Sequence, residues 1–348
     1  MPPEIVSDGG SVGGRGRVFL YMAMCISALA LFGCAGADGG ARLSYSIFFP
    51  PGHAQTRAAA QWAAEIEART QGKIKIVLFP GETLTKSTRV YDGVVNGVSD
   101  LGMSAFAYTR GRFPLLEGLD LPLGYPDGKI ATKAANAIFH KYNPPEVKDV
   151  RIMYLHAHGP GVLAARKEIK SLTDMKGIKV RGTGLSAKIV SSLGAVPVSM
   201  GQGETYEALQ RGVVEATLCP IETLKGWRQA EVVNYVLTTA ATGYTTTMYS
   251  IMNKDRWNSL PDSIKDIFNQ VNEMWIEKQG QAWDSADEEA KVLLKEMGKP
   301  NTRLAPGEEE IFVKAVDPML EDWAASLEER GLPGKSVLAD LRALVKEG

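Results

Sequence analysis

Cysteine is scarce in this chain, which has 3 cysteines in 348 residues. Cys25 and Cys34 fall in an N-terminal segment that differs from the rest of the chain, so Cys219 is the one thiol expected in the body of the protein. One thiol forms neither an internal disulfide nor a zinc site. Cysteine chemistry is therefore excluded from the function that we expect.

Histidine is scarce as well, with 4 residues in all. His156 and His158 stand two apart and resemble half of a metal site, but His53 and His140 are far from them in sequence and no CxxC or HExxH pattern accompanies them. We expect no metal and no cofactor. Donors that line a cleft, or simple surface histidines, are the two other interpretations of the pair.

An excess of charge of either sign is also absent. Lys and Arg total 39 against 40 for Asp and Glu, which gives a net charge of −1. A nucleic-acid-binding protein usually carries a basic surface, so no nucleic acid is expected as a partner. The mature chain has no GxSxG pattern, and this leaves a serine hydrolase without its nucleophile.

Long apolar runs are missing after Leu43. The one such run, Val18 to Phe32, follows Arg15 and Arg17 and ends at a glycine, which predicts a signal peptide over residues 1–33. The string Leu31 to Cys34 resembles a bacterial lipobox, so Cys34 is the expected lipidation site. Ordinary cleavage near residues 35–37 is the alternative. Either form predicts a periplasmic protein, tethered to a membrane if Cys34 is lipidated.

The pattern of apolar residues predicts an α/β fold with two domains. Residues 43–49, 73–79 and 100–105 are expected strands separated by helices at 56–70 and 89–95, and this order favours a parallel sheet. From residue 151 a second alternation of strands and helices begins. The β-branched run over 236–251 predicts long strands that cross between the two units.

The predicted domains follow from these patterns. Domain I covers 43–150, completed by part of 236–260, and domain II covers 151–235. Helical periodicity over 264–297 predicts one helix of roughly 50 Å that braces both domains. The C-terminal part, 261–348, contains this helix, a helix over 308–330 and a last helix over 337–347.

A glycine-rich string, Gly182 to Ala187 (GTGLSA), follows a predicted strand and opens a helix. It satisfies the GxGxxA pattern of dinucleotide-binding folds, and Glu204 lies where the ribose-binding acid is expected. However, Glu204 opens a helix, and an exported protein rarely meets nicotinamide cofactors. The glycines equally permit a tight turn whose backbone amides face an anion.

Arg181 ends a predicted parallel strand, at the edge where ligands of open α/β sheets bind. A guanidinium matches a carboxylate with two parallel hydrogen bonds and stays charged at any working pH. We therefore expect Arg181 to bind a carboxylate, and a surface ion pair is the alternative.

Several strings together resemble the solute receptors of tripartite ATP-independent periplasmic (TRAP) transporters. These strings are DMKGIKVRGTG (174–184), LGAVPVSM (193–200), ETYEALQRGVVEAT (204–217), MNKDRWNSLP (252–261) and FPLLEGLDLP (113–122). The similarity runs from about Leu43 to the last helix. It implies two α/β domains of the periplasmic-binding-protein type, with the ligand in the cleft between them.

The resemblance also implies which residues bind. Arg181 matches the carboxylate-binding arginine of the family, and the loops 50–53 and 105–108 would face it. Glu222 matches the position of a polar ligand contact. The second arginine of the sialic-acid receptors, expected near Pro160 or Gly161, is missing, so a sugar acid is not expected. The remaining ligand-binding candidates are Phe49, His53, Phe106, Tyr108, His158 and Trp227.

A cleft that has rings and few charges favours an apolar or aromatic monocarboxylate, or a 2-oxo acid. The expected function is that of a TRAP receptor, not an enzyme, which passes an organic acid to the membrane subunits of the transporter. The alternative is an exported α/β enzyme that uses His156 or His158 as a base. A sensory module would need a signalling partner encoded elsewhere. Monomer and homodimer both remain open.

Overall fold

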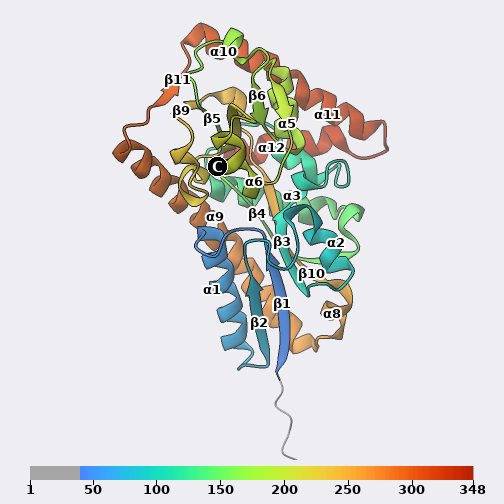
Figure 1. Ribbon diagram of the computed structural model, residues 1–348. Coiled ribbons are helices and arrows are strands. Elements are labelled where there is room, and N and C mark those ends of the chain that lie inside the picture. Colours follow the sequence, from blue (N-terminus) through green and yellow to red (C-terminus); the bar gives the residue numbers. More distant parts are fainter. Residues whose placement is uncertain (1–39, 348) are drawn as a thin grey trace, which may run out of the picture. The chain divides into compact units, whose positions relative to one another are not determined.

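The computed structural model describes residues 40–347, and these residues form two mixed β-sheets covered by helices (Figure 1). The predicted signal peptide and Cys34 lie outside the described residues. The α/β fold class is confirmed. The division into domains at residue 150 stays a prediction.

The first sheet has the strand order β2-β1-β3-β10-β4. Its strands are β1 (Ala41–Ile47), β2 (Ile74–Phe79), β3 (Leu101–Ala105), β4 (Val150–Ala157) and β10 (Thr247–Asn253). Strands β2, β1 and β3 are parallel, as the βαβαβ pattern predicts, whereas β10 is antiparallel to both β3 and β4. The predicted parallel unit is therefore confirmed, and β10 makes the sheet mixed because it arrives from the other sheet and runs in the opposite direction.

The second sheet has the order β11-β9-β5-β8-β6-β7. Its strands are β5 (Gly161–Ala165), β6 (Lys179–Arg181), β7 (Val196–Val198), β8 (Ala216–Pro220), β9 (Tyr235–Thr238) and β11 (Asn301–Arg303). The chain crosses between the sheets three times, from β4 to β5, from β9 to β10, and from β10 through α8 and α9 to β11. The predicted crossing over 236–251 is thus confirmed, although a 3₁₀ turn at Ala240–Thr242 interrupts it.

Helices cover both sheets, and their amphipathic periods were the clearest signal in the sequence. They are α1 (Ala54–Arg69), α2 (Val90–Val95), α3 (Gly128–Tyr142), α4 (Leu172–Met175), α5 (Gly184–Ser192), α6 (Gln202–Gln210), α7 (Thr223–Gly226), α8 (Lys254–Ser259), α9 (Asp262–Glu296), α10 (Pro306–Val316), α11 (Pro318–Glu328) and α12 (Gly334–Glu347). The single helix expected over 308–330 is divided at Asp317, because Pro318 lacks an amide proton and begins a new helix.

Helix α9 is the long brace that the sequence predicts, with 35 residues. It contacts α1, α3 and β4, which cover or belong to the first sheet, and α7, which follows β8 of the second sheet. Among residues 40–347 no helix is both long and apolar enough to cross a membrane.

Candidate functional site

A narrow cavity lies where loops of the two sheets meet. Its lining includes Phe48 and Phe49 after β1, Tyr108 after β3, Arg181 at the end of β6 and Trp227 after α7. These residues come from strand ends, the place where open α/β sheets bind ligands. The remaining lining residues are His158, Thr183, Gln202, Pro220, Glu222, Thr223, Tyr244, Thr246, Met248 and Trp283.

Arg181 is the cation of this cavity. Its side chain is buried, at 4% exposure, and it donates to the carbonyl oxygens of Met200 (3.1 Å from Nη2) and Leu218 (3.5 Å from Nη1). None of the ion pairs formed within residues 40–347 includes Arg181. A buried charge without a counter-ion is costly, so this guanidinium favours an anion beside it.

Hydrogen-bonding groups surround the guanidinium. Burial raises the pKa of Tyr108, and the Arg181 charge lowers it in part, which places the phenol close to the guanidinium. The backbone amide of Gln202 donates to Tyr108 Oη at 3.3 Å and so joins a loop of the first sheet to α6 of the second. Tyr108 therefore contacts both sides of the cavity.

Aromatic rings form the apolar part of the lining. Phe48 stacks near Trp227 at 6.1 Å between centroids and meets Tyr108 edge-on at 5.6 Å. Phe49 packs edge-on against Trp283 of α9 at 5.8 Å. Such faces and edges suit a planar apolar group.

The cavity is too narrow for an organic acid as it stands. Its volume is about 30 Å³, which is enough for one or two waters. Close contacts between the two sides keep it narrow; for example, a Cβ on Gly184 would lie 2.9 Å from the Cβ of Ala107. An organic acid therefore enters only when the two sides separate.

A second, larger hollow of about 490 Å³ is lined by residues of α9, β5 and the loop before α3. Carboxylates of Asp127, Asp284, Asp287 and Glu288 line it together with exposed basic side chains. Its basic lining residues are all exposed, so none of them is desolvated as Arg181 is. We therefore place the candidate site in the smaller cavity that contains Arg181.

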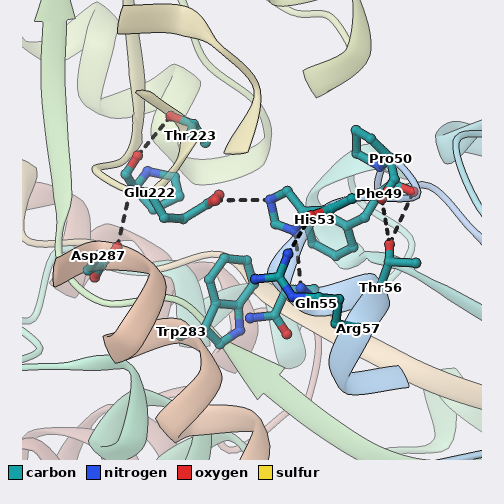
Figure 2. Close-up of polar contacts among 12 residues, drawn as sticks. Phe49, Pro50, His53, Gln55, Thr56, Arg57, Glu222, Thr223, Trp283 and Asp287 are labelled. Carbon is teal, nitrogen blue, oxygen red and sulfur yellow. Dashed lines mark hydrogen bonds and ion pairs between the residues drawn. The ribbon is translucent and has the colours of Figure 1, made fainter. Parts of the chain in front are cut away.

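Six of the eight ligand-binding residues expected from the sequence line this cavity, namely Phe49, Tyr108, His158, Arg181, Glu222 and Trp227. His53 does not line it. Its imidazole lies behind Glu222, with Nε2 at 2.9 Å from Glu222 Oε2 (Figure 2). His53 thus contacts a lining residue and stands outside the cavity itself.

Phe106 also does not line the cavity. Its ring is fully buried and packs against Phe113 at 4.8 Å and Tyr249 at 5.0 Å, in the core of the first sheet. Phe106 was expected to contact the ligand, and the structure instead gives it a packing role in the core.

The two histidines of the pair lie in different places: His156 is in the core, and His158 lines the cavity. His156 lies inside β4, and its Nδ1 accepts from Trp283 Nε1 at 3.0 Å. Burial lowers the pKa of His156 to about 3 and that of His158 to about 4. Both imidazoles are poor bases at neutral pH, which argues against the enzyme that would use one of them. Within residues 40–347 no cluster of three or more metal-ligating side chains occurs.

Sequence reasoning missed several lining residues. Phe48, Gln202 and Tyr244 belong to the lining, and so does Trp283, which the helical pattern marks only as an apolar position. Nothing in the sequence distinguishes a buried ring in the core from one that faces a cavity. Cys219 is fully buried, and burial raises the pKa of its thiol to about 12, in line with the expected absence of thiol chemistry.

Asp287 of α9 supports Glu222 from the side away from His53. Its Oδ1 accepts from the backbone amide of Glu222 at 3.1 Å (Figure 2). Burial and the nearby Glu222 raise the pKa of Asp287 from 3.8 to about 8. At neutral pH the native protein therefore holds a proton on Asp287 that the unfolded chain has lost.

This proton predicts a pH dependence of stability. The contribution of Asp287 is fully present below pH about 4 and is lost as the pH rises through about 8. In Asp287→Asn the side-chain oxygen still accepts from Glu222 but no longer titrates. We expect the melting temperature of the variant, relative to the native protein, to rise between pH about 5 and about 9. Parallel melting curves for the two proteins over this range would contradict the assignment.

Together the fold and the cavity define an α/β protein with a narrow cavity between its two sheets. A family model described as bacterial extracellular solute-binding protein, family 7, matches residues 45–326. The chain belongs to this family.

Curated relatives agree with this assignment. A solute-binding protein of Albidiferax ferrireducens is 26% identical over 63% of this chain, and the match spans 66% of that protein. A monocarboxylate 2-oxoacid-binding periplasmic protein of Nostoc sp. is 27% identical over 73% of this chain and 70% of its own length.

Solved structures show the same fold. A TRAP periplasmic solute-binding protein of Bordetella bronchiseptica with bound mandelate has a TM-score of 0.83 at 27% identity, covering 88% of this chain and 99% of that one. A TRAP solute-binding protein of Rhodoferax ferrireducens with copurified benzoate also has a TM-score of 0.83, at 25% identity, covering 88% and 98%. Both are receptors, as are the members of the matched family, which removes the alternative of an exported enzyme.

Proposed function

We propose that this protein is the receptor of a TRAP transporter and captures a monocarboxylate that carries an apolar or aromatic group. The observation that carries the proposal is the buried guanidinium of Arg181, which pairs with no carboxylate of residues 40–347 and lines a cavity rich in aromatic rings. Such an acid matches both parts of the cavity. Its carboxylate neutralises the guanidinium, and its apolar part packs against Phe48, Phe49 and Trp227.

The mechanism is capture by closure. In the open form Arg181 is accessible and binds the carboxylate. The loops of the first sheet then meet the second sheet, and contacts such as Tyr108 with Gln202 and His53 with Glu222 form across the ligand. Since these contacts add to those of the ligand, the ligand shifts the population toward the closed form.

The closed receptor would pass its acid to the membrane subunits of the transporter. The benzoate and mandelate bound to the two neighbouring structures support an aromatic acid, and the name of the Nostoc relative supports a 2-oxo acid as a second class. We place the protein in the periplasm, with lipidated Cys34 as its tether, on the strength of the N-terminal sequence.

The test is binding without turnover. Isothermal titration of the mature protein with aromatic, aliphatic and 2-oxo monocarboxylates is expected to find saturable binding of one acid per chain, and mass spectrometry of the released ligand should recover it unchanged. Strict preference for a dicarboxylate, or chemical conversion of the bound acid, would contradict the proposal.

A further inference from the structure

Two acceptor atoms of the cavity lining have no hydrogen-bond partner in the part of the chain that the structure describes. Glu222 is buried at 2% exposure, and its Oε1 is unpartnered. His158 is fully buried, and its Nε2 is unpartnered as well. No ion pair joins Glu222 to Arg181 within the described part of the chain, so the Glu222 carboxylate does not neutralise the Arg181 guanidinium.

His53 fixes how Glu222 is held. The backbone amide of Gln55 donates to His53 Nδ1 at 3.2 Å, because His53 caps the first turn of α1. With Nδ1 accepting, the ring proton lies on Nε2 and is donated to Glu222 Oε2 at 2.9 Å. This uses one carboxylate oxygen and leaves Oε1 as an acceptor.

Gly226 closes the other side of this pair. A Cβ at Gly226 would lie 2.6 Å from Glu222 Oε2 and 2.7 Å from His53 Nε2. The histidine and the carboxylate are therefore packed closely against the backbone of Gly226, where no larger residue fits without a shift.

His158 is an acceptor for a similar reason. Its Nδ1 lies 2.5 Å from the carbonyl oxygen of Gly159, and a carbonyl only accepts, so Nδ1 carries the proton. The ring is neutral at working pH, since burial holds its pKa at about 4. His158 Nε2 is therefore an acceptor, and His158 lines the same cavity as Glu222.

We infer that Glu222, oriented by His53, makes this receptor selective for monocarboxylates that also carry a hydroxyl or N–H donor. The inference rests on the proposed function and adds the chemical class of the ligand. A donor on the acid satisfies a buried acceptor that is otherwise unpaired, whereas an acid without one leaves it unpaired at a cost. A second carboxylate on the ligand meets the charge of Glu222 and is rejected.

The test compares acids of similar shape. The probes are 3- and 4-hydroxybenzoate, the matching fluorobenzoates, which lack the donor, and the benzenedicarboxylates, which carry a second charge. In the native protein at least one hydroxy acid is expected to bind on the order of tenfold to a hundredfold more tightly than its fluoro counterpart. The dicarboxylates are expected to bind more weakly than both.

Glu222→Gln provides the decisive variant. His53 Nε2 still donates, so the amide oxygen of the new side chain must face His53 and the amide N–H₂ takes the place of Oε1. The variant is expected to lose the preference for the hydroxyl and to bind dicarboxylates better than the native protein does. Glu207→Gln is the matched control, because it makes the same chemical change on an exposed side chain of α6 that does not line the cavity; its preference for the hydroxy acid should remain.

Three results would overturn the inference. Equal affinity of the native protein for the hydroxy and fluoro acids, with binding still dependent on Arg181, would refute the role of Glu222 and leave the proposed function intact. A requirement for an added metal cation would assign Glu222 to that cation. Failure of every monocarboxylate to bind would instead refute the proposed function.

Discussion

Arg181→Met is expected to abolish binding of the acid while the ligand-free protein keeps or gains stability. Removing one partner of a desolvated charge pair weakens binding on the order of a hundredfold or more. In the closed form without ligand, however, the guanidinium is buried and donates to carbonyl oxygens, and no ion pair within residues 40–347 includes it, so an apolar side chain of similar length relieves that cost. Few substitutions at a buried position combine these two outcomes.

Thermal unfolding measures both effects together. A hundredfold excess of ligand over its dissociation constant adds roughly 2.7 kcal/mol to the native protein, and this gain should vanish in Arg181→Met. Arg181→Lys is the control for charge, since it keeps a cation but loses the planar fork, and it should retain part of the affinity. A full ligand-induced shift in Arg181→Met would mean that another group binds the acid.

Trp283→Ala is expected to cost about 3–5 kcal/mol of the free energy of unfolding, the largest effect on stability that we predict. The indole is fully buried in α9, packs against Phe49 and stacks with His156 at 5.9 Å. Its removal leaves a cavity between the brace helix and the strand ends that carry the ligand site. The ligand affinity should fall with the stability, because the same ring lines the site.

Two further variants separate packing from hydrogen bonding. Trp283→Phe keeps most of the ring volume and leaves His156 Nδ1 without its donor, at an expected cost of about 1–3 kcal/mol. Trp257→Ala removes a partly exposed indole of α8 and should cost less than Trp283→Ala. Urea unfolding followed by circular dichroism measures all three. A loss below about 1 kcal/mol in Trp283→Ala would contradict the packing role of this ring.

Local sequence patterns predicted the fold well, because in most of its helices and strands the apolar residues recur at the spacing typical of that element. The helix expected over 264–297 is observed at Asp262–Glu296, and the strand expected over 73–79 at Ile74–Phe79. Strand β5 (Gly161–Ala165) was missed because it is short and begins at a glycine, and β11 because three polar residues carry no apolar alternation. Strand β11 pairs with β9, and the edge of the existing sheet determines this pairing rather than the sequence of β11 itself.

The site was only partly predictable, and the reason is distance along the chain. Arg181 was found because its strand-end position and its chemistry agree. His53 was expected to touch the ligand, yet it binds Glu222, 169 residues away, and no local pattern reveals such a pair. Similarly, Phe48 and Phe106 each come directly after a strand, and only the fold places Phe106 in the core and Phe48 in the cavity lining.

The crystal structure of the protein with the tightest-binding monocarboxylate tests the central claim most directly. The account predicts that the two carboxylate oxygens lie about 3 Å from nitrogens of the Arg181 guanidinium, with the apolar part of the acid between Phe48 and Trp227. An acid bound elsewhere, with Arg181 still donating only to the carbonyls of Met200 and Leu218, would contradict it.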